Sequence, residues 1–457
     1  MHFMPCRGLN FHPLALAYAP PLFGPLAQSV EQLAFNQLVA GSNPARPTIT
    51  ANHPRVVFLI YRDDGASQKA PCDHDRNGIV LMELSMSSTF HPPQRTLMGP
   101  GPSDVSSRVL AASARPTIGH LDPEFVRLMD DVKRLLQFAF QTQNELTIPL
   151  SAPGSAGMEA AFVNLLEPGD TAIVCQNGVF GGRMKENVER CGAKVVLVQD
   201  RWGAPVDPEK VSAVIQANPN AKVLAFVHAE TSTGVRSDAE QLCQLAKAAG
   251  MLTIVDAVTS LAGIDLKVDA WGADVVYSGT QKCLSSLPGI APITFSPDAV
   301  AAITSRTHKV QSWFLDMNLI MGYWGEGAKR AYHHTAPVNA IYALHESLLM
   351  LEEEGLLESF ARHRENHAAL ATGLAELGLE LAVAETWRLP QLNAVSIPEG
   401  KDDAAIRSRL LAEFNLEVGA GLGELAGKQW RIGLMGSSSS AVNINRCLTA
   451  FEAVLAS

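Results

Sequence analysis

After about residue 122, the sequence predicts an α/β fold with a mostly parallel sheet covered by helices on both faces. Short β-branched and apolar runs alternate with helical stretches. The runs are apolar throughout, which is typical of strands buried on both faces. Small and polar residues follow several runs directly. Ligands of such sheets bind at the carboxyl ends of the strands, so the chemistry is expected there.

The helical period begins at Asp122. The segment "DPEFVRLMDDVKRLLQFAF" places its apolar residues on one helical face. The predicted strands that follow are TAIVCQ, KVVLVQ, VLAFVHAE, LTIVDAV, DVVYSG and APITFS. Helices such as MEAAFVNLL and DAEQLCQLAKAAG separate them, and the second is expected to end at Gly250, because glycine commonly closes a helix.

The pattern changes again after about Pro337. One long helical tract with a break near Gly355 precedes shorter, mixed strand and helix signals. We therefore expect four parts: residues 1–81, an extension; 82–121, an entry segment; 122–345, the large domain; and 346–457, a smaller α+β domain. No internal repeat is visible.

The extension, residues 1–81, is unlike the rest. It sustains neither a helical nor a strand period. The stretch Gly24 to Thr48, "GPLAQSVEQLAFNQLVAGSNPARPT", resembles the peptide read from a transfer-RNA gene. We expect translation to begin at Met82 or Met86, with a disordered extension as the alternative. Both interpretations predict that the segment has no part in the chemistry.

Composition excludes several classes of protein. The 457 residues carry a formal net charge of −10, with 36 basic against 46 acidic residues, which disfavours nucleic acid as the main partner. The seven scattered cysteines form no C-x-x-C pair, and this is typical of a reduced cytoplasmic enzyme. No run of 18 apolar residues predicts a membrane span.

Two ionisable residues follow neighbouring predicted strands. Asp256 comes directly after TIV, and Lys282 follows VVYSGTQ, 26 residues later. That spacing has room for one short crossover, so both are expected at the same sheet edge. A carboxylate there is costly to bury unless it meets a cation. A salt bridge at a domain seam is the plain alternative.

Three further segments belong to this edge. The small turn Ser151 to Ala161 opens a helix, a suitable place for a phosphate. Phe180 lies in a glycine-rich loop, and "ETST", Glu230 to Thr233, ends a strand. Each is weak alone. Together with Asp256 and Lys282 they indicate a lysine that holds an aldehyde cofactor as a Schiff base and an acid that keeps a pyridine nitrogen protonated.

Competing cofactor motifs are absent from the sequence. No G-x-G-x-x-G follows a strand, no G-x-x-x-x-G-K-[ST] is present, and there is no H-E-x-x-H zinc pattern. These absences remove the nicotinamide, nucleotide and zinc interpretations.

From about Leu97 to Leu455 the sequence resembles the class V aminotransferases, which are fold-type I pyridoxal-phosphate enzymes. The likeness is greatest to the alanine–glyoxylate and serine–glyoxylate aminotransferases. The motifs that carry it are LMGPGPSDV, SAGMEAAFVNLLEPGD, YSGTQKCLSSLPG, YHHTAPVNAIYAL and RIGLMG. The resemblance implies a large domain with a mostly parallel sheet of the seven-stranded type. It also implies pyridoxal 5′-phosphate as cofactor, small amino acids and 2-oxo acids as substrates, and a homodimer with shared active sites.

The resemblance also implies a role for individual residues. Lys282 would hold the cofactor and move the substrate's α-proton, Asp256 would pair with the pyridine nitrogen, and Arg431 would bind the substrate carboxylate. The remaining cofactor contacts would be Phe180 against the ring, Thr231 on the ring hydroxyl, Gly154, Ser155 and Gln281 on the phosphate, and Tyr332 and Thr335 from the second subunit.

Departures from the family pattern leave alternatives open. Pro153 stands where relatives often have a hydroxyl residue or glycine, and Phe180 lacks an indole N–H. His120 matches a position near the site mouth but could equally be structural. The alternatives are a pyridoxamine or aminophosphonate aminotransferase, a desulfurase that would need a mobile cysteine such as Cys283, and a silent binding protein of this fold.

Overall fold

The computed structural model describes residues 56–60, 80–84, 89–325 and 330–456. The chain divides into two compact units, Met1–Pro93 and Gln94–Ser457. In the first unit, β1 (Val56–Ile60) pairs with β2 (Val80–Leu84) in antiparallel register. Apart from these strands, the predicted extension and the possible start at Met86 lie outside the described residues.

The second unit is built on a mixed sheet whose strand order is β4-β12-β11-β10-β7-β5-β6. Its strands are β4 (Leu146–Leu150), β5 (Thr171–Gln176), β6 (Lys194–Gln199), β7 (Val223–Val227), β10 (Leu252–Asp256), β11 (Val275–Tyr277) and β12 (Ala291–Phe295). Within this sheet, β12 alone runs antiparallel to its neighbours. The expected α/β fold with a mostly parallel sheet is confirmed, and all six predicted runs form strands.

The strand that the sequence did not predict is β4. Pro149 interrupts its sequence, LTIPL, and proline cannot donate to a strand ladder. The structure accommodates Pro149 because β4 lies at the edge of the sheet and pairs only with β12.

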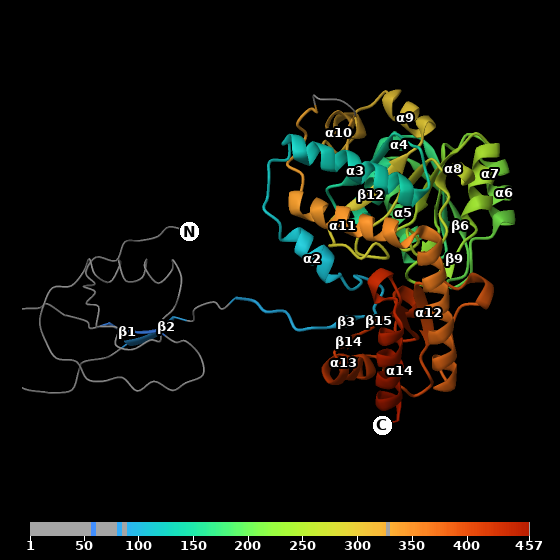
Figure 1. Cartoon of the computed structure of the whole chain (residues 1–457). Helices are drawn as coiled ribbons and strands as arrows, with labels where there is room; N and C mark the ends of the chain where they lie inside the picture. The colour runs from blue at the N-terminus through green and yellow to red at the C-terminus, as the bar shows by residue number, and fades with distance from the viewer. Residues whose placement is uncertain (1–55, 61–79, 85–88, 326–329, 457) are drawn as a thin grey trace, which may run out of the picture. The chain divides into compact units, whose positions relative to one another are not determined.

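Helices cover the sheet, as Figure 1 shows. They are α3 (Pro123–Phe140), α4 (Gly154–Leu165), α5 (Val179–Arg190), α6 (Pro208–Ala217), α7 (Ala239–Ala248), α8 (Val268–Trp271), α9 (Pro297–Thr304), α10 (Met317–Trp324) and α11 (Val338–Glu354). Local sequence explains the start of α3, where the Asp122 side chain accepts from Glu124 N–H and Pro123 occupies the first turn. The predicted end of α7 is confirmed, because Gly250 adopts φ 73° just beyond it.

The C-terminal part has its own hydrophobic core around Trp430 and Phe451. Gly355, at φ 89°, separates α11 from the next helix, so the predicted break is confirmed. The elements are α12 (Leu356–Glu376), η1 (Glu385–Trp387), β13 (Leu392–Ser396), α13 (Asp403–Phe414), β14 (Leu416–Glu417), β15 (Gly419–Ala420), η2 (Gly423–Leu425), β16 (Gln429–Gly433), η3 (Gly436–Ser438) and α14 (Ala441–Leu455). Strands β13, β16 and β15 form a small sheet. The exact domain limits at residues 121, 345 and 346 remain predictions.

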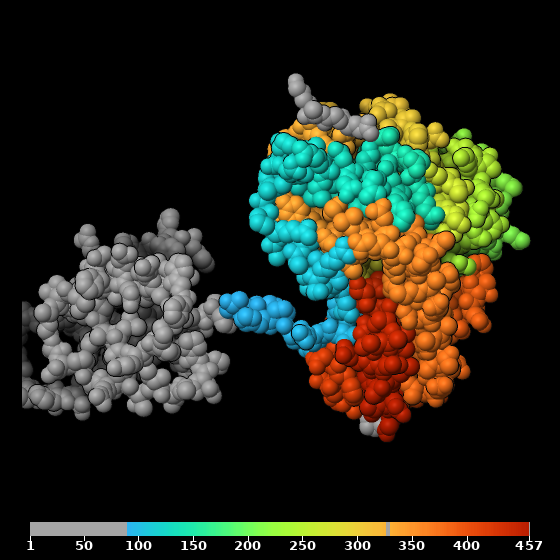
Figure 2. Space-filling view, viewed as in Figure 1, coloured from blue at the N-terminus to red at the C-terminus, as the bar shows by residue number. Residues whose placement is uncertain are grey.

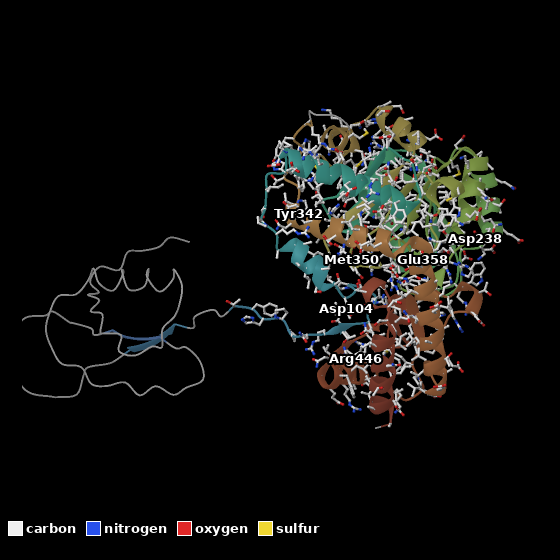
Figure 3. The ribbon with its side chains drawn as sticks, in the orientation of Figure 1. Asp104, Asp238, Tyr342, Met350, Glu358 and Arg446 are labelled. Atoms are coloured by element: carbon white, nitrogen blue, oxygen red, sulfur yellow. The ribbon has the colours of Figure 1, made fainter. Side chains whose placement is uncertain are left out.

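The segment that precedes the large sheet binds to the C-terminal part. Strand β3 (Thr96–Leu97) pairs with β14, and α2 (Ser107–Ser113) follows it. Asp104 N–H donates to Ser438 Oγ at 2.8 Å, and Arg446 donates to Thr96 Oγ1 (Figure 3). In Figure 2 the red C-terminal residues and the orange residues of α12 form one continuous surface. The segment around Pro100 is thereby fixed between the two cores.

Candidate active site

The carboxyl ends of β10 and β11 bring the two ionisable residues to one edge of the sheet. The two strands are parallel neighbours, and Asp256, the last residue of β10, is in register with Tyr277, the last residue of β11. Lys282 lies in the loop that follows β11. The expectation that Asp256 and Lys282 follow neighbouring strands is confirmed.

The Lys282 amine is buried at this edge. Its side chain is 9% exposed, and Nζ donates to the carbonyl of Pro100. Gly101 adopts φ 104°, a conformation that favours glycine, and a Cβ there would lie 2.6 Å from Nζ. Burial, helped by the nearby charge of Arg431, lowers the pKa of Lys282 to about 8. Among the described residues no ion pair joins Lys282 to Asp256, so the salt-bridge alternative is not observed.

Asp256 is held by two donors. Its Oδ2 accepts from the Tyr277 hydroxyl at 2.8 Å, and its Oδ1 accepts from Val258 N–H at 2.9 Å. Burial raises the pKa of Asp256 to about 6, against the opposing effect of these hydrogen bonds and of Lys282. The carboxylate is therefore ionised at neutral pH. Tyr277 was not predicted as a site residue from the sequence. Its position at the end of the strand next to β10 is the signal that identifies it.

A potential anion site lies at the start of α4. Its N-cap, Pro153, makes no side-chain hydrogen bond to the first turn. Gly154 packs closely on the loop after β11, because a Cβ there would lie 3.2 Å from the carbonyl oxygen of Ser278. Ser155 is exposed, and Gln281 Oε1 is buried without a hydrogen-bond partner. Uncapped N–H groups at a helix start suit an anionic group such as a phosphate.

Phe180 and Thr231 come from two adjoining segments. Phe180, in the first turn of α5, is half-buried, and the Arg183 guanidinium lies 4.8 Å from its ring centroid. Thr231 is buried, and its hydroxyl lies 2.5 Å from that of Thr259. The ring of Phe180 is thus not fully enclosed in the core.

Arg431, on β16, is brought to the same region from the C-terminal part. It is 6% exposed, its Nε donates to Ala420 O at 2.8 Å, and its Nη1 donates to Thr231 O at 3.1 Å. Burial lowers its pKa to about 10, so it stays a cation at neutral pH. No carboxylate of the described ranges forms an ion pair with it. Such a guanidinium is suited to a carboxylate ligand.

Tyr332 and Thr335 are both exposed on the chain that carries them. The structure gives them no hydrogen bond to the other predicted site residues within the ranges it describes. The Tyr332 ring lies 5.3 Å from the ring of His120, whose Nε2 is buried without a partner. His120 also accepts from the Tyr323 hydroxyl through its carbonyl, at 3.1 Å.

An open groove of about 670 Å³ runs beside α4 and α5. Its lining includes Ser155, Met158, Arg183 and Gln311. Lys282, Asp256 and Arg431 do not line it. The groove therefore meets the predicted site only at Ser155.

Taken together, the donor set fits a planar, phosphorylated aldehyde with a ring nitrogen. The buried amine of Lys282 can take an aldehyde, and the buried carboxylate of Asp256 can face a protonated ring nitrogen. The uncapped N–H groups at the start of α4 can donate to a phosphate, and so could the amide N–H groups of the Gln281 side chain.

The chain is similar to proteins of known activity over most of its length. Residues 103–424 match the family model described as aminotransferase class-V. The alanine–glyoxylate aminotransferase of Oryctolagus cuniculus is 41% identical, covering 83% of this chain and 97% of the relative. The (S)-ureidoglycine–glyoxylate transaminase of Bacillus subtilis is 36% identical, with 79% and 91% covered. The crystal structure of an alanine–glyoxylate aminotransferase from Nostoc sp. is similar with a TM-score of 0.79 and 44% identity, covering 81% of this chain and 98% of that one.

Proposed function

The chain belongs to the class V aminotransferases, and on that basis we propose that it moves an amino group from a small amino acid, alanine or serine, to glyoxylate. We further propose pyridoxal 5′-phosphate as its cofactor. Glyoxylate is proposed as the acceptor because of the relatives' names. Two relatives named for different donors, alanine and (S)-ureidoglycine, are both named for glyoxylate. An intact set of Lys282, Asp256 and Arg431 supports an active enzyme over a silent binding protein.

The cofactor is proposed to lie at the edge formed by β10 and β11. Lys282 holds it covalently, Asp256 faces its ring nitrogen and Phe180 packs on its ring. Gly154, Ser155 and Gln281 hold its phosphate, and Thr231 binds its ring hydroxyl. When bound, the cofactor supplies an aldehyde that takes up the amino group and a ring that withdraws electrons from the substrate's Cα.

Lys282 is proposed as the general base and acid of the reaction. With a pKa of about 8, its amine, when not bound to the cofactor, would take the proton from the substrate's Cα and then give it up again near neutral pH. Asp256 stays ionised above a pKa of about 6, and its charge favours a proton on the facing ring nitrogen.

Arg431 is proposed to orient the substrate. A planar guanidinium binds a carboxylate with two parallel hydrogen bonds, and both the amino acid and the 2-oxo acid carry that carboxylate. The Arg431 Nε and Nη1 atoms already donate to main-chain carbonyls, which fixes the plane of the guanidinium group. The substrate's Cα is thereby directed toward Lys282.

The donor is tested by half-reactions. The purified enzyme, loaded with pyridoxal 5′-phosphate, is mixed with alanine, serine or (S)-ureidoglycine, and its visible absorption band is recorded before glyoxylate is added. We expect one of the first two donors to bleach the band and glyoxylate to restore it. If only (S)-ureidoglycine bleaches the band, the donor is neither alanine nor serine. If pyruvate but not glyoxylate restores the band, the proposed acceptor is wrong.

A desulfurase is the less favoured alternative. A desulfurase needs a mobile, reactive cysteine, and Cys283 beside the lysine does not suit that role. Cys283 is 6% exposed, and burial raises the pKa of its thiol to about 12. The cysteine desulfurase of Thermococcus onnurineus is similar in structure with a TM-score of 0.63 but only 14% identical, so this likeness shows the fold alone. Release of sulfide from cysteine by the loaded enzyme would revive this alternative.

We also propose a homodimer in which Tyr332 and Thr335 complete the partner's phosphate site. Their exposure on their own subunit supports this. A cytoplasmic location is proposed as well, and the five described cysteines, all free thiols, support a reducing compartment. In the described ranges, no helix has the length and apolar character needed to cross a membrane.

A further inference from the structure

Helix α5, which carries Phe180, begins without a cap of its own. Its N-cap is Gly178, which has no side chain to accept from the first turn. The first N–H groups of a helix have no partner within the helix and must find acceptors elsewhere. In α5 they find them about 50 residues further along the chain.

Glu230 and Ser232 supply these acceptors. Val179 N–H donates to Ser232 Oγ at 3.0 Å, and Phe180 N–H donates to Glu230 Oε2 at 3.2 Å. The other carboxylate oxygen, Oε1, accepts from Ser232 N–H at 3.0 Å and from Ser232 Oγ at 2.5 Å. Glu230 is fully buried, and no cation of the described residues forms an ion pair with it. A buried carboxylate at the positive end of a helix dipole is stabilised there.

The approach of the two segments is close enough to require a glycine. A Cβ on Gly178 would lie 2.4 Å from Glu230 Cδ and 2.6 Å from Ser232 Oγ. The first turn of α5 therefore rests directly on the carboxylate.

The same short segment also contacts the substrate arginine. Thr231, between the two capping residues, accepts from Arg431 Nη1 through its carbonyl at 3.1 Å. The next carbonyl, that of Ser232, accepts from Gln429 Nε2 at 3.2 Å. One tripeptide thus connects the aromatic of α5 to the arginine of β16.

From this geometry we propose that Glu230 is a positioning residue, which caps α5 from outside the helix and so holds the ring of Phe180 against the cofactor. This inference rests on the proposed function. It assigns Glu230 no contact with substrate or cofactor. Burial, together with the nearby charge of Asp256, raises the pKa of Glu230 to about 7, and the hydrogen bonds from Ser232 and Phe180 oppose this shift.

The test compares Glu230→Gln with Glu376→Gln, which alters an exposed glutamate on α12. In Glu230→Gln, one oxygen is replaced by an amide group that cannot accept from N–H. We expect faster hydrogen exchange at the amides of Val179 and Phe180 in the apoprotein. We also expect the Kd for pyridoxal 5′-phosphate to rise about tenfold, the size of effect expected when a buried charged hydrogen bond is lost. Glu376→Gln is expected to change neither.

A double-mutant cycle separates positioning from simple support of the fold. If Glu230 acts through the ring, then Glu230→Gln should weaken cofactor binding little further in a Phe180→Ala background, which keeps the amide but removes the ring. An undiminished tenfold loss in that background would overturn the proposal, as would unchanged exchange and unchanged Kd. If Glu230→Gln does not fold, the same measurements are made on Ser232→Ala, because this substitution removes the hydroxyl that accepts from Val179 N–H. A wild-type protein that fails to bind pyridoxal 5′-phosphate would instead contradict the proposed function.

Discussion

At the scale of single residues, burial sets the reactivity of the Lys282 amine. Only a neutral amine attacks an aldehyde, and the neutral fraction rises with pH until the pKa is passed. Since the pKa of Lys282 is lowered to about 8, we expect the rate at which the apoprotein takes up pyridoxal 5′-phosphate to rise up to about pH 8 and then level off. An ordinary exposed lysine would keep gaining reactivity to about pH 10. Stopped-flow absorbance across this range checks the prediction, and a rate still climbing steeply above pH 9 would contradict it.

The guanidinium group of Arg431, proposed to bind the substrate carboxylate, is the second feature at the residue scale. Removing it in Arg431→Ala should raise the KM for amino acid and 2-oxo acid by about 10- to 100-fold, because a bidentate charged pair is lost. Arg431→Lys should recover only part of that loss, since an ammonium keeps the charge without the planar fork. Steady-state kinetics with both substrates measure the effect. Arg407→Ala, which removes a guanidinium paired with Asp403 on α13, is the control and should leave KM unchanged.

At the scale of elements, close packing of α4 on the sheet places its first turn. A Cβ on Gly157 would lie 3.0 Å from Ala291 Cβ and 3.3 Å from Tyr277 Cβ. These neighbours belong to β12 and β11 and cannot move far. We therefore expect Gly157→Val to lower the free energy of unfolding by about 1–3 kcal/mol, measured by urea denaturation.

The matched control for this prediction is Gly182→Ala in α5. A Cβ there meets the flexible end of the Gln176 side chain at 3.2 Å. The gain in helix propensity, up to about 1 kcal/mol, should offset that contact. Equal losses in the two variants would show that any added side chain destabilises these helices, and that packing on the strands is not the cause.

Elements also show what a sequence reveals and what it does not. Asp256 and Lys282 could be predicted at one edge because apolar runs mark the strands, and parallel strands end on the same side. Strand β4 was not predicted, because its short run, LTIPL, was not recognised, and Pro149 in it is accommodated at the edge of the sheet. The support of Phe180 by Glu230 could not be predicted either. The two residues lie 50 positions apart, and no local pattern encodes a cap supplied by another segment.

At the scale of the whole molecule, the proposed dimer makes each active site depend on two chains. Tyr332 and Thr335 are exposed on their own subunit, while Lys282 is buried at the sheet edge. Lys282→Ala should abolish turnover because the reactive amine is lost, and a Tyr332→Ala/Thr335→Ala variant should lose most activity through weak cofactor binding. Neither change removes core packing, so both proteins should fold, which circular dichroism checks.

Mixing these two inactive variants tests the sharing directly. If Tyr332 and Thr335 act across the interface, each mixed dimer holds one site with an intact Lys282 and an intact Tyr332 and Thr335. After unfolding and refolding together, half the dimers are mixed, so about a quarter of the wild-type activity should return. If the residues act within one subunit, every site in the mixed dimer carries a defect and no activity returns. Activity of the refolded mixture, against each variant refolded alone, therefore decides whether two chains build one site.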